Sequence, residues 1–173
     1  MRKLLILLLL LTSTAFAQVR TYGDMETKTF VIGLANYYFG DAGSLSFQAG
    51  GVPVTVTLSD GRILSGTQVL LPEAPAGNSL IGAHDFTGDE VPEIVAATRG
   101  EGYVKAQVFR LEEGAWKLLG TVGARGDVEE IRVFRQALTV REKASDVLYT
   151  WTFHGSRFDF KSSSGGLDPA LGL

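Results

Sequence analysis

The segment Ala83-His84-Asp85-Phe86-Thr87-Gly88-Asp89-Glu90-Val91-Pro92-Glu93-Ile94-Val95-Ala96-Ala97 carries the strongest chemical signal in the chain. Acidic residues alternate, or nearly alternate, around a glycine, and an apolar run typical of a strand follows at once. Side chains at positions one, three, five and nine of such a turn can converge on a cation, together with the backbone carbonyl at position seven. The segment therefore indicates an ion-braced β-structure rather than a catalytic site.

Strand patterns lie on both sides of this segment. Residues 53–58 alternate between apolar and polar side chains, as expected of a half-buried strand. Asp60-Gly61 follows them and predicts a tight hairpin, because both residues tolerate a positive φ. No segment of adequate length shows a 3.6-residue period, so we expect an all-β fold with strands over residues 30–34, 45–47, 53–58, 63–71, 94–98, 103–111, 116–120, 128–134, 138–141, 147–153 and 158–160.

The acidic segment resembles a known repeat. Asp85, Gly88 and Asp89, with the variable pair Val91-Pro92 and the apolar Ile94-Val95, are similar to the FG-GAP or VCBS-type repeat of integrin-α propellers and many secreted bacterial proteins. The loop of that family reads Asp-x-Asx-Gly-Asp-Gly-x-x-Asp and precedes an apolar strand. The resemblance implies Ca²⁺ as cofactor, with ligands from Asp85, Thr87, Asp89, the carbonyl of Val91, and Glu93.

Three positions depart from the family pattern. Thr87 offers a neutral oxygen in place of Asn or Asp, and Glu93 is one methylene longer than Asp. Glu90 replaces a glycine, so a residue with a Cβ must take any left-handed conformation required there, at a cost of about 1 kcal/mol. The alternative is a vestigial turn in which Asp85 and Asp89 cap backbone amides without an ion. Both interpretations stay open on the sequence alone.

The resemblance also bears on architecture. It is strong over residues 85–97 and loose over 80–119, with a degenerate second copy indicated because Gly126-Asp127 and the region around Trp151 echo the first. One or two blades cannot close a propeller of typically 4–8 blades. We therefore expect antiparallel blade-like hairpins that form a small sandwich or open barrel. The expected domain spans 18–161, with an N-terminal β-part (18–79), a blade region (80–161) and a flexible tail (162–173).

The first residues predict export. Arg2 and Lys3 precede an unbroken apolar run over 4–11, and Ala15-Phe16-Ala17 has the form of a signal-peptide cleavage site. A membrane span needs about 20 apolar residues, and Thr12 interrupts the run too early. Residues 1–17 are thus expected to be a signal peptide, and the protein is expected in the periplasm, at the cell surface or outside the cell. The chain has no cysteine, which excludes disulfides and lipid attachment through cysteine.

Charge restricts the kind of partner. Removal of residues 1–17 leaves 156 of 173 residues and lowers the formal net charge from −3 to −5, because Arg2 and Lys3 are lost. This length corresponds to one domain. The acidic balance and the scattered basic residues argue against nucleic acid or an anionic membrane surface as partner. No transmembrane span is expected after signal cleavage.

Catalytic patterns are weak, and we assign no catalytic residue. His84 and His154 are the only histidines, and each lies at an expected strand end, where a lone histidine is usually ordinary surface. Ser156 is close to His154 in sequence, but neighbours on one turn seldom form a nucleophile–base pair with a third orienting group. Asp89 and Glu93 as a glycosidase acid pair are better explained by an ion.

These observations predict a non-catalytic, exported β-protein of the envelope or medium that acts as a binding or assembly module. The alternative is an exported hydrolase, or a hydrolase inhibitor, with an unrecognised site. An envelope or extracellular protein or a glycan is the expected partner. The aromatic residues Tyr37-Tyr38-Phe39, Trp116 and Trp151 are expected to pack in the core, or to form a glycan or protein contact surface if they are exposed.

Overall fold

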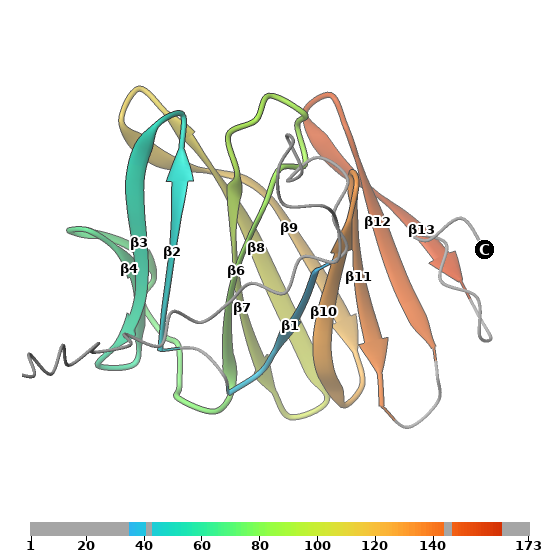
Figure 1. Ribbon diagram of the computed structural model, residues 1–173. Helices are drawn as coiled ribbons and strands as arrows, with labels where there is room; N and C mark the ends of the chain where they lie inside the picture. The colour runs from blue at the N-terminus through green and yellow to red at the C-terminus, as the bar shows by residue number, and fades with distance from the viewer. Residues whose placement is uncertain (1–34, 41–42, 144–146, 164–173) are drawn as a thin grey trace, which may run out of the picture.

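The computed structural model describes residues 35–40, 43–143 and 147–163. Over these residues the chain is all-β, and its strands form three antiparallel sheets, none of which closes into a barrel. Figure 1 shows the three sheets side by side. The expected fold class is confirmed, in the form of a small sandwich.

Each sheet contains four strands that pair in chain order, and the third sheet has a fifth strand from earlier in the chain. The first sheet consists of β2 (Ser44–Ala49), β3 (Val52–Ser59), β4 (Arg62–Ser65) and β5 (Gln68–Leu71). The central sheet consists of β6 (Ser79–His84), β7 (Glu93–Gly100), β8 (Tyr103–Glu112) and β9 (Ala115–Arg125). The third sheet consists of β10 (Val128–Phe134), β11 (Ala137–Glu142), β12 (Leu148–His154) and β13 (Arg157–Ser163), with β1 (Ala35–Tyr38) added beside β10.

The hairpin predicted at Asp60-Gly61 is confirmed, with φ values of 51° and 69° between β3 and β4. The single return strand expected over 63–71 is wrong. The chain turns at Gly66, where φ is 58°, and β4 and β5 pair antiparallel with each other. The strand expected over 116–120 is longer than predicted, because β9 continues to Arg125 opposite β8.

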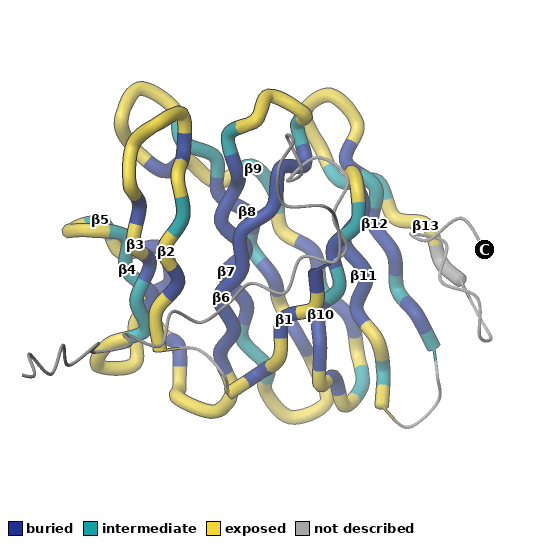
Figure 2. The backbone as a smooth tube through the Cα atoms, in the orientation of Figure 1, coloured by how far each residue is buried: buried dark blue, intermediate teal, exposed yellow. Residues whose placement is uncertain are grey.

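The central sheet is the middle layer of three. Val95 and Ala97 face a core shared with the third sheet, whereas Ile94 and Ala96 face a core shared with the first sheet. All six residues of β6 are buried, as the dark-blue tube in Figure 2 shows. A strand covered on both faces does not alternate, which is why the period-two pattern did not reveal β6.

Side chains from the neighbouring sheets occupy both edges of the central sheet. At β6, the Tyr37 hydroxyl donates to the carbonyl of Ala83 (2.5 Å) and accepts from the Ala83 N–H (3.2 Å). At β9, the Gln68 amide donates to the carbonyl of Trp116 (2.6 Å) and accepts from the Trp116 N–H (2.8 Å). The tyrosine ring passes so close to Gly82 that a Cβ there would lie 2.7 Å from it. These contacts connect the layers.

The aromatic residues divide between core and surface. Tyr37, Phe39, Trp116 and Trp151 are buried, so the packing expected of them is confirmed. Tyr38 is exposed on the outer face of the third sheet.

One of the two sequence echoes has a structural counterpart. The hairpins β8–β9 and β12–β13 are the last two strands of their sheets. Gly88-Asp89 lies between β6 and β7, whereas Gly126-Asp127 joins the central sheet to the third, so these two turns are not equivalent. A second copy of the repeat stays a prediction.

Several predictions fall on residues outside the described ranges: the signal peptide 1–17, the strand 30–34 and the tail beyond Ser163. Ser162 and Ser163, which the sequence assigned to that tail, belong to β13. The described part of the chain contains no helix long and apolar enough to span a membrane.

Candidate metal site in the loop between β6 and β7

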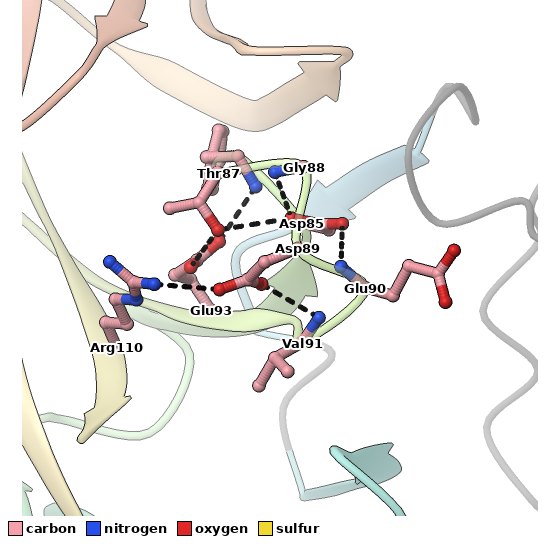
Figure 3. A network of polar contacts seen from close by, with 9 residues as sticks. Asp85, Thr87, Gly88, Asp89, Glu90, Val91, Glu93 and Arg110 are labelled. Carbon is pink, nitrogen blue, oxygen red and sulfur yellow. Dashed lines mark hydrogen bonds and ion pairs between the residues drawn. The ribbon is translucent and has the colours of Figure 1, made fainter.

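Residues 85–92 connect β6 to β7. His84 and Glu93 pair directly across these two strands, so the loop begins and ends at the same point of the central sheet. This pairing brings Asp85 close to Glu93, although eight positions separate them in sequence. The strand ends therefore hold both acids in place, and Figure 3 shows their side chains with that of Asp89.

Asp85 organises the turn. Its side chain is 1% exposed; Oδ1 accepts from the Gly88 N–H (2.6 Å) and Oδ2 from the Glu90 N–H (2.9 Å). Gly88 and Glu90 have φ values of 77° and 67°. The left-handed conformation expected at Glu90 is therefore present, at the cost of about 1 kcal/mol that a Cβ imposes.

Glu93 closes the turn from the start of β7. The residue is 0% exposed, its Oε2 accepts from the Phe86 N–H (2.8 Å), and its Oε1 accepts from the Thr87 hydroxyl (3.1 Å). Burial raises the pKa of Glu93 to about 7, since the charged form loses its hydration. The two hydrogen bonds lower the pKa, and the charges of Asp85 and Asp89 raise it.

Asp89 is the exposed member of the group. Its Oδ1 accepts from the Val91 N–H (3.0 Å), and its Oδ2 forms an ion pair of 2.8 Å with Arg110 on β8. Desolvation raises the pKa of Asp89, but the hydrogen bonds from Val91, Thr87 and Arg110 and the charge of Arg110 outweigh it, so the pKa lies below its ordinary value. Asp89 is therefore ionised at neutral pH.

The three acids form one cluster. One carboxylate oxygen from each of Asp85, Asp89 and Glu93 lies within 4.8 Å of the others, so the cluster could hold a metal ion. The Thr87 hydroxyl lies between Glu93 (3.1 Å) and Asp85 (3.4 Å). Val91 joins the network through its N–H, and the ligand role of its carbonyl stays a prediction.

The charges of the cluster admit either a proton or a cation. Three ionised carboxylates and the Arg110 guanidinium together carry a charge of −2, which a divalent cation would neutralise. Without a cation, the raised pKa of Glu93 means that this carboxyl retains a proton over much of the range up to pH 7. The hydrogen bonds also hold the turn closed by themselves, as the vestigial-turn interpretation requires.

Two participants were not identified from the sequence. Arg110 comes from β8, and only the register of β7 and β8, with Ile94 opposite Phe109, brings it to the loop. The ring of Phe86 is fully buried and packs against Phe158 at 5.3 Å between ring centroids. Neither position carries a local pattern that distinguishes it from an ordinary strand or turn residue.

The expectation that both histidines are surface residues is wrong for His84. It is 3% exposed, its Nε2 lies 2.6 Å from the carbonyl oxygen of Arg135, and its ring packs on Phe86. Burial lowers the pKa of His84, although the Arg135 carbonyl and the charge of Asp85 oppose the shift. His154 is exposed as expected. Among the described residues no hydrogen bond joins either histidine to a serine or threonine hydroxyl, and nothing indicates catalytic activity.

Comparisons of the chain with protein-family models, with curated proteins and with solved structures found no match. The resemblance to the FG-GAP repeat therefore rests on the sequence motif alone and stays a prediction.

Proposed function

We propose that the protein is an exported, non-catalytic binding or assembly module of the cell envelope or extracellular medium, with a Ca²⁺ ion that braces the loop between β6 and β7. The observation that carries the proposal is the convergence of Asp85, Asp89 and Glu93, whose carboxylate oxygens lie within 4.8 Å of one another. The partner of this binding or assembly module would be an envelope or extracellular protein or a glycan.

The chemistry of the cluster favours Ca²⁺. The available donors are carboxylate oxygens and the Thr87 hydroxyl, all of them hard oxygen ligands. The ligand atoms that converge come from three acids and no histidine, and His84 has its Nε2 at the Arg135 carbonyl, so the donor set suits a hard cation better than a softer metal. Mg²⁺ demands a small octahedron at about 2.0–2.1 Å, whereas Ca²⁺ accepts longer bonds and more variable ligand positions.

The place of the loop supports a structural role. Phe86 lies between two cluster members in sequence and packs in the core between the central and third sheets. Its N–H donates to Glu93, so any ligand that fixes this carboxylate also fixes the backbone of Phe86. An ion at the cluster would therefore stabilise the contact between two layers, which is useful to an exported chain that contains no cysteine for disulfides.

Thermal unfolding with and without calcium tests the ion. At about 1 mM free Ca²⁺ and a Kd near 10 µM, binding adds about 2.7 kcal/mol to the free energy of unfolding, a rise of several degrees in Tm. Asp85→Asn and Asp89→Asn should each abolish most of this calcium-dependent rise. Glu101→Gln, in the exposed β7–β8 turn, is the matched control and should retain it.

The readout is the difference in Tm between calcium and chelator within each variant, because Asp85→Asn also weakens the hydrogen bonds to Gly88 and Glu90. Mg²⁺ should substitute poorly. Equal melting curves of the unaltered protein in calcium and in chelator would show that the loop is a vestigial turn.

Intact-mass measurement tests the export step. Protein recovered from the envelope or medium should begin at Gln18, because Ala15-Phe16-Ala17 has the small-x-small form that signal peptidase cleaves. A mass that retains residues 1–17 would contradict export by this route.

A further inference from the structure

The strand edges of the molecule differ in how they are covered. Tyr37 and Gln68 occupy the edges of the central sheet by bonding to the backbone of Ala83 and Trp116. β13 is the last strand of the third sheet and is seven residues long. Within the described ranges, no strand pairs with its outer edge and no side chain bonds to its backbone. Such an edge is available for pairing with another strand.

The hairpin geometry shows which backbone groups face this edge. In β8–β9, Glu112 and Ala115 flank a two-residue turn, and the next residue, Trp116, directs its N–H and carbonyl outward to Gln68. In β12–β13, His154 and Arg157 flank the two-residue turn Gly155-Ser156. By the same alternation of antiparallel pairs, Phe158 and Phe160 direct their backbone groups outward from β13.

Phe160 leaves an apolar surface at this edge. Its side chain is 54% exposed, although its ring contacts that of Trp151 at 5.3 Å between centroids. Phe158 lies two residues before Phe160 in β13. There β9 approaches β13 so closely that a Cβ on Gly120 would lie 2.9 Å from the Phe158 ring. The central sheet therefore covers Phe158 but leaves Phe160 open.

We propose that two copies of this chain pair through β13, antiparallel, about a twofold axis at Phe160. Each Phe160 would then lie beside Phe160 of the second copy, and the two five-stranded sheets would join into one of ten strands. Residues directly opposite each other in this register sum to 320, so Asp159 faces Lys161 of the second copy, twice per dimer. This inference goes beyond the proposed function and does not depend on calcium.

Charge and the length of strand overlap together select this register. With the axis at Asp159, the two Asp159 side chains would oppose each other and Arg157 would oppose Lys161, which is unfavourable. With the axis at Phe158, Arg157 would face Asp159, but the strands would overlap over fewer residues and Lys161 would have no cross-strand partner. Edge charges usually prevent pairing; in the register centred on Phe160 they are complementary.

Sedimentation of the purified protein in chelator, up to about 0.5 mM, tests the proposal. The unaltered protein should show a concentration-dependent monomer–dimer equilibrium. Asp159→Lys and Lys161→Asp should each raise the dissociation constant at least about tenfold, because like charges then oppose each other. Glu101→Lys and Lys105→Asp make the same charge changes at exposed positions away from β13 and should leave dimerisation unchanged.

Mixing the two variants gives the sharper result. A chain with Asp159→Lys and a chain with Lys161→Asp have complementary charges in the register centred on Phe160, so the mixture should form a heterodimer that native mass spectrometry resolves. This recovery also shows that both variants are folded. A protein that stays monomeric, a dimer that tolerates Lys161→Asp, or a mixture without heterodimer would overturn the proposal.

Discussion

Glu93 is the residue on which the chemistry of the loop depends. It is fully buried, accepts hydrogen bonds from Phe86 and Thr87, and has a pKa near 7 because burial penalises its charge. Asp89, at the surface beside Arg110, has a pKa below its ordinary value. A proton and a cation therefore compete for the cluster chiefly at Glu93.

This competition predicts a stability that falls with pH when calcium is absent. The folded pKa of Glu93, about 7, lies above the ordinary value of 4.5, so its contribution is fully present below about pH 4.5 and is lost as pH rises through 7. The loss is about 3 kcal/mol between these limits. Urea unfolding in chelator at a series of pH values, compared with Glu93→Gln, should reveal it.

Glu93→Gln is the matched variant because its amide keeps the size of the side chain and never ionises. In chelator, the free energy of unfolding of the unaltered protein should fall relative to that of Glu93→Gln as pH rises from about 4.5 through 7, and then level off. Saturating calcium should restore the stability of the unaltered protein above pH 7. Parallel pH profiles for both proteins in chelator would contradict the assignment.

Among the secondary structure elements, β6 and β9 are the edge strands of the central sheet, and each accepts a side chain from a neighbouring sheet. Antiparallel sheets expose backbone groups at their outer strands. Here Tyr37 from β1 binds Ala83 in β6, and Gln68 from β5 binds Trp116 in β9. Burial raises the pKa of Tyr37 to about 12, so its hydroxyl stays protonated and keeps this contact throughout the physiological range.

Tyr37→Phe removes this contact and little else. The substitution leaves the buried N–H and carbonyl of Ala83 without the hydroxyl, which should cost about 1–3 kcal/mol of unfolding free energy. Tyr103→Phe, which removes a hydroxyl from an exposed tyrosine, should stay within about 0.5 kcal/mol. Chemical denaturation measures both, and equal stabilities would show that the hydroxyl does not stabilise the edge.

At the scale of the molecule, the described residues form two hydrophobic cores that share the central sheet. Leu138 lies in the core between the central and third sheets, and Ile63 lies in the core between the central and first sheets. Since β7 and β8 contribute side chains to both cores, loss of either one removes support from the same strands. We therefore expect the three layers to unfold together.

The two tryptophans allow this to be measured, because Trp151 lies in the first of these cores and Trp116 in the second. In proteins that each retain one tryptophan, the two fluorescence transitions should have the same midpoint. Leu138→Ala and Ile63→Ala should each lower both midpoints, by about 2–5 kcal/mol of unfolding free energy. Midpoints that separate, or a substitution that moves only one of them, would show that the layers unfold independently.

The sequence by itself determined the features that depend on neighbours along the chain. Alternation of apolar and polar residues identified strands with one covered face, such as β3, because side chains in a strand point to opposite faces in turn. Asp60-Gly61 determined a hairpin, and the spacing of Asp85, Asp89 and Glu93 indicated an acidic turn at the end of a strand.

Only the tertiary structure decided what the layers cover. β6 has no alternation because sheets lie on both of its faces, and the same burial removes His84 from the surface. Arg110 contacts Asp89 because of the register of β7 and β8. Tyr37, in the third sheet, bonds to Ala83 in the central sheet. Burial and pairing of this kind depend on residues distant in sequence. A local pattern of side chains therefore does not predict which layer will pack against it.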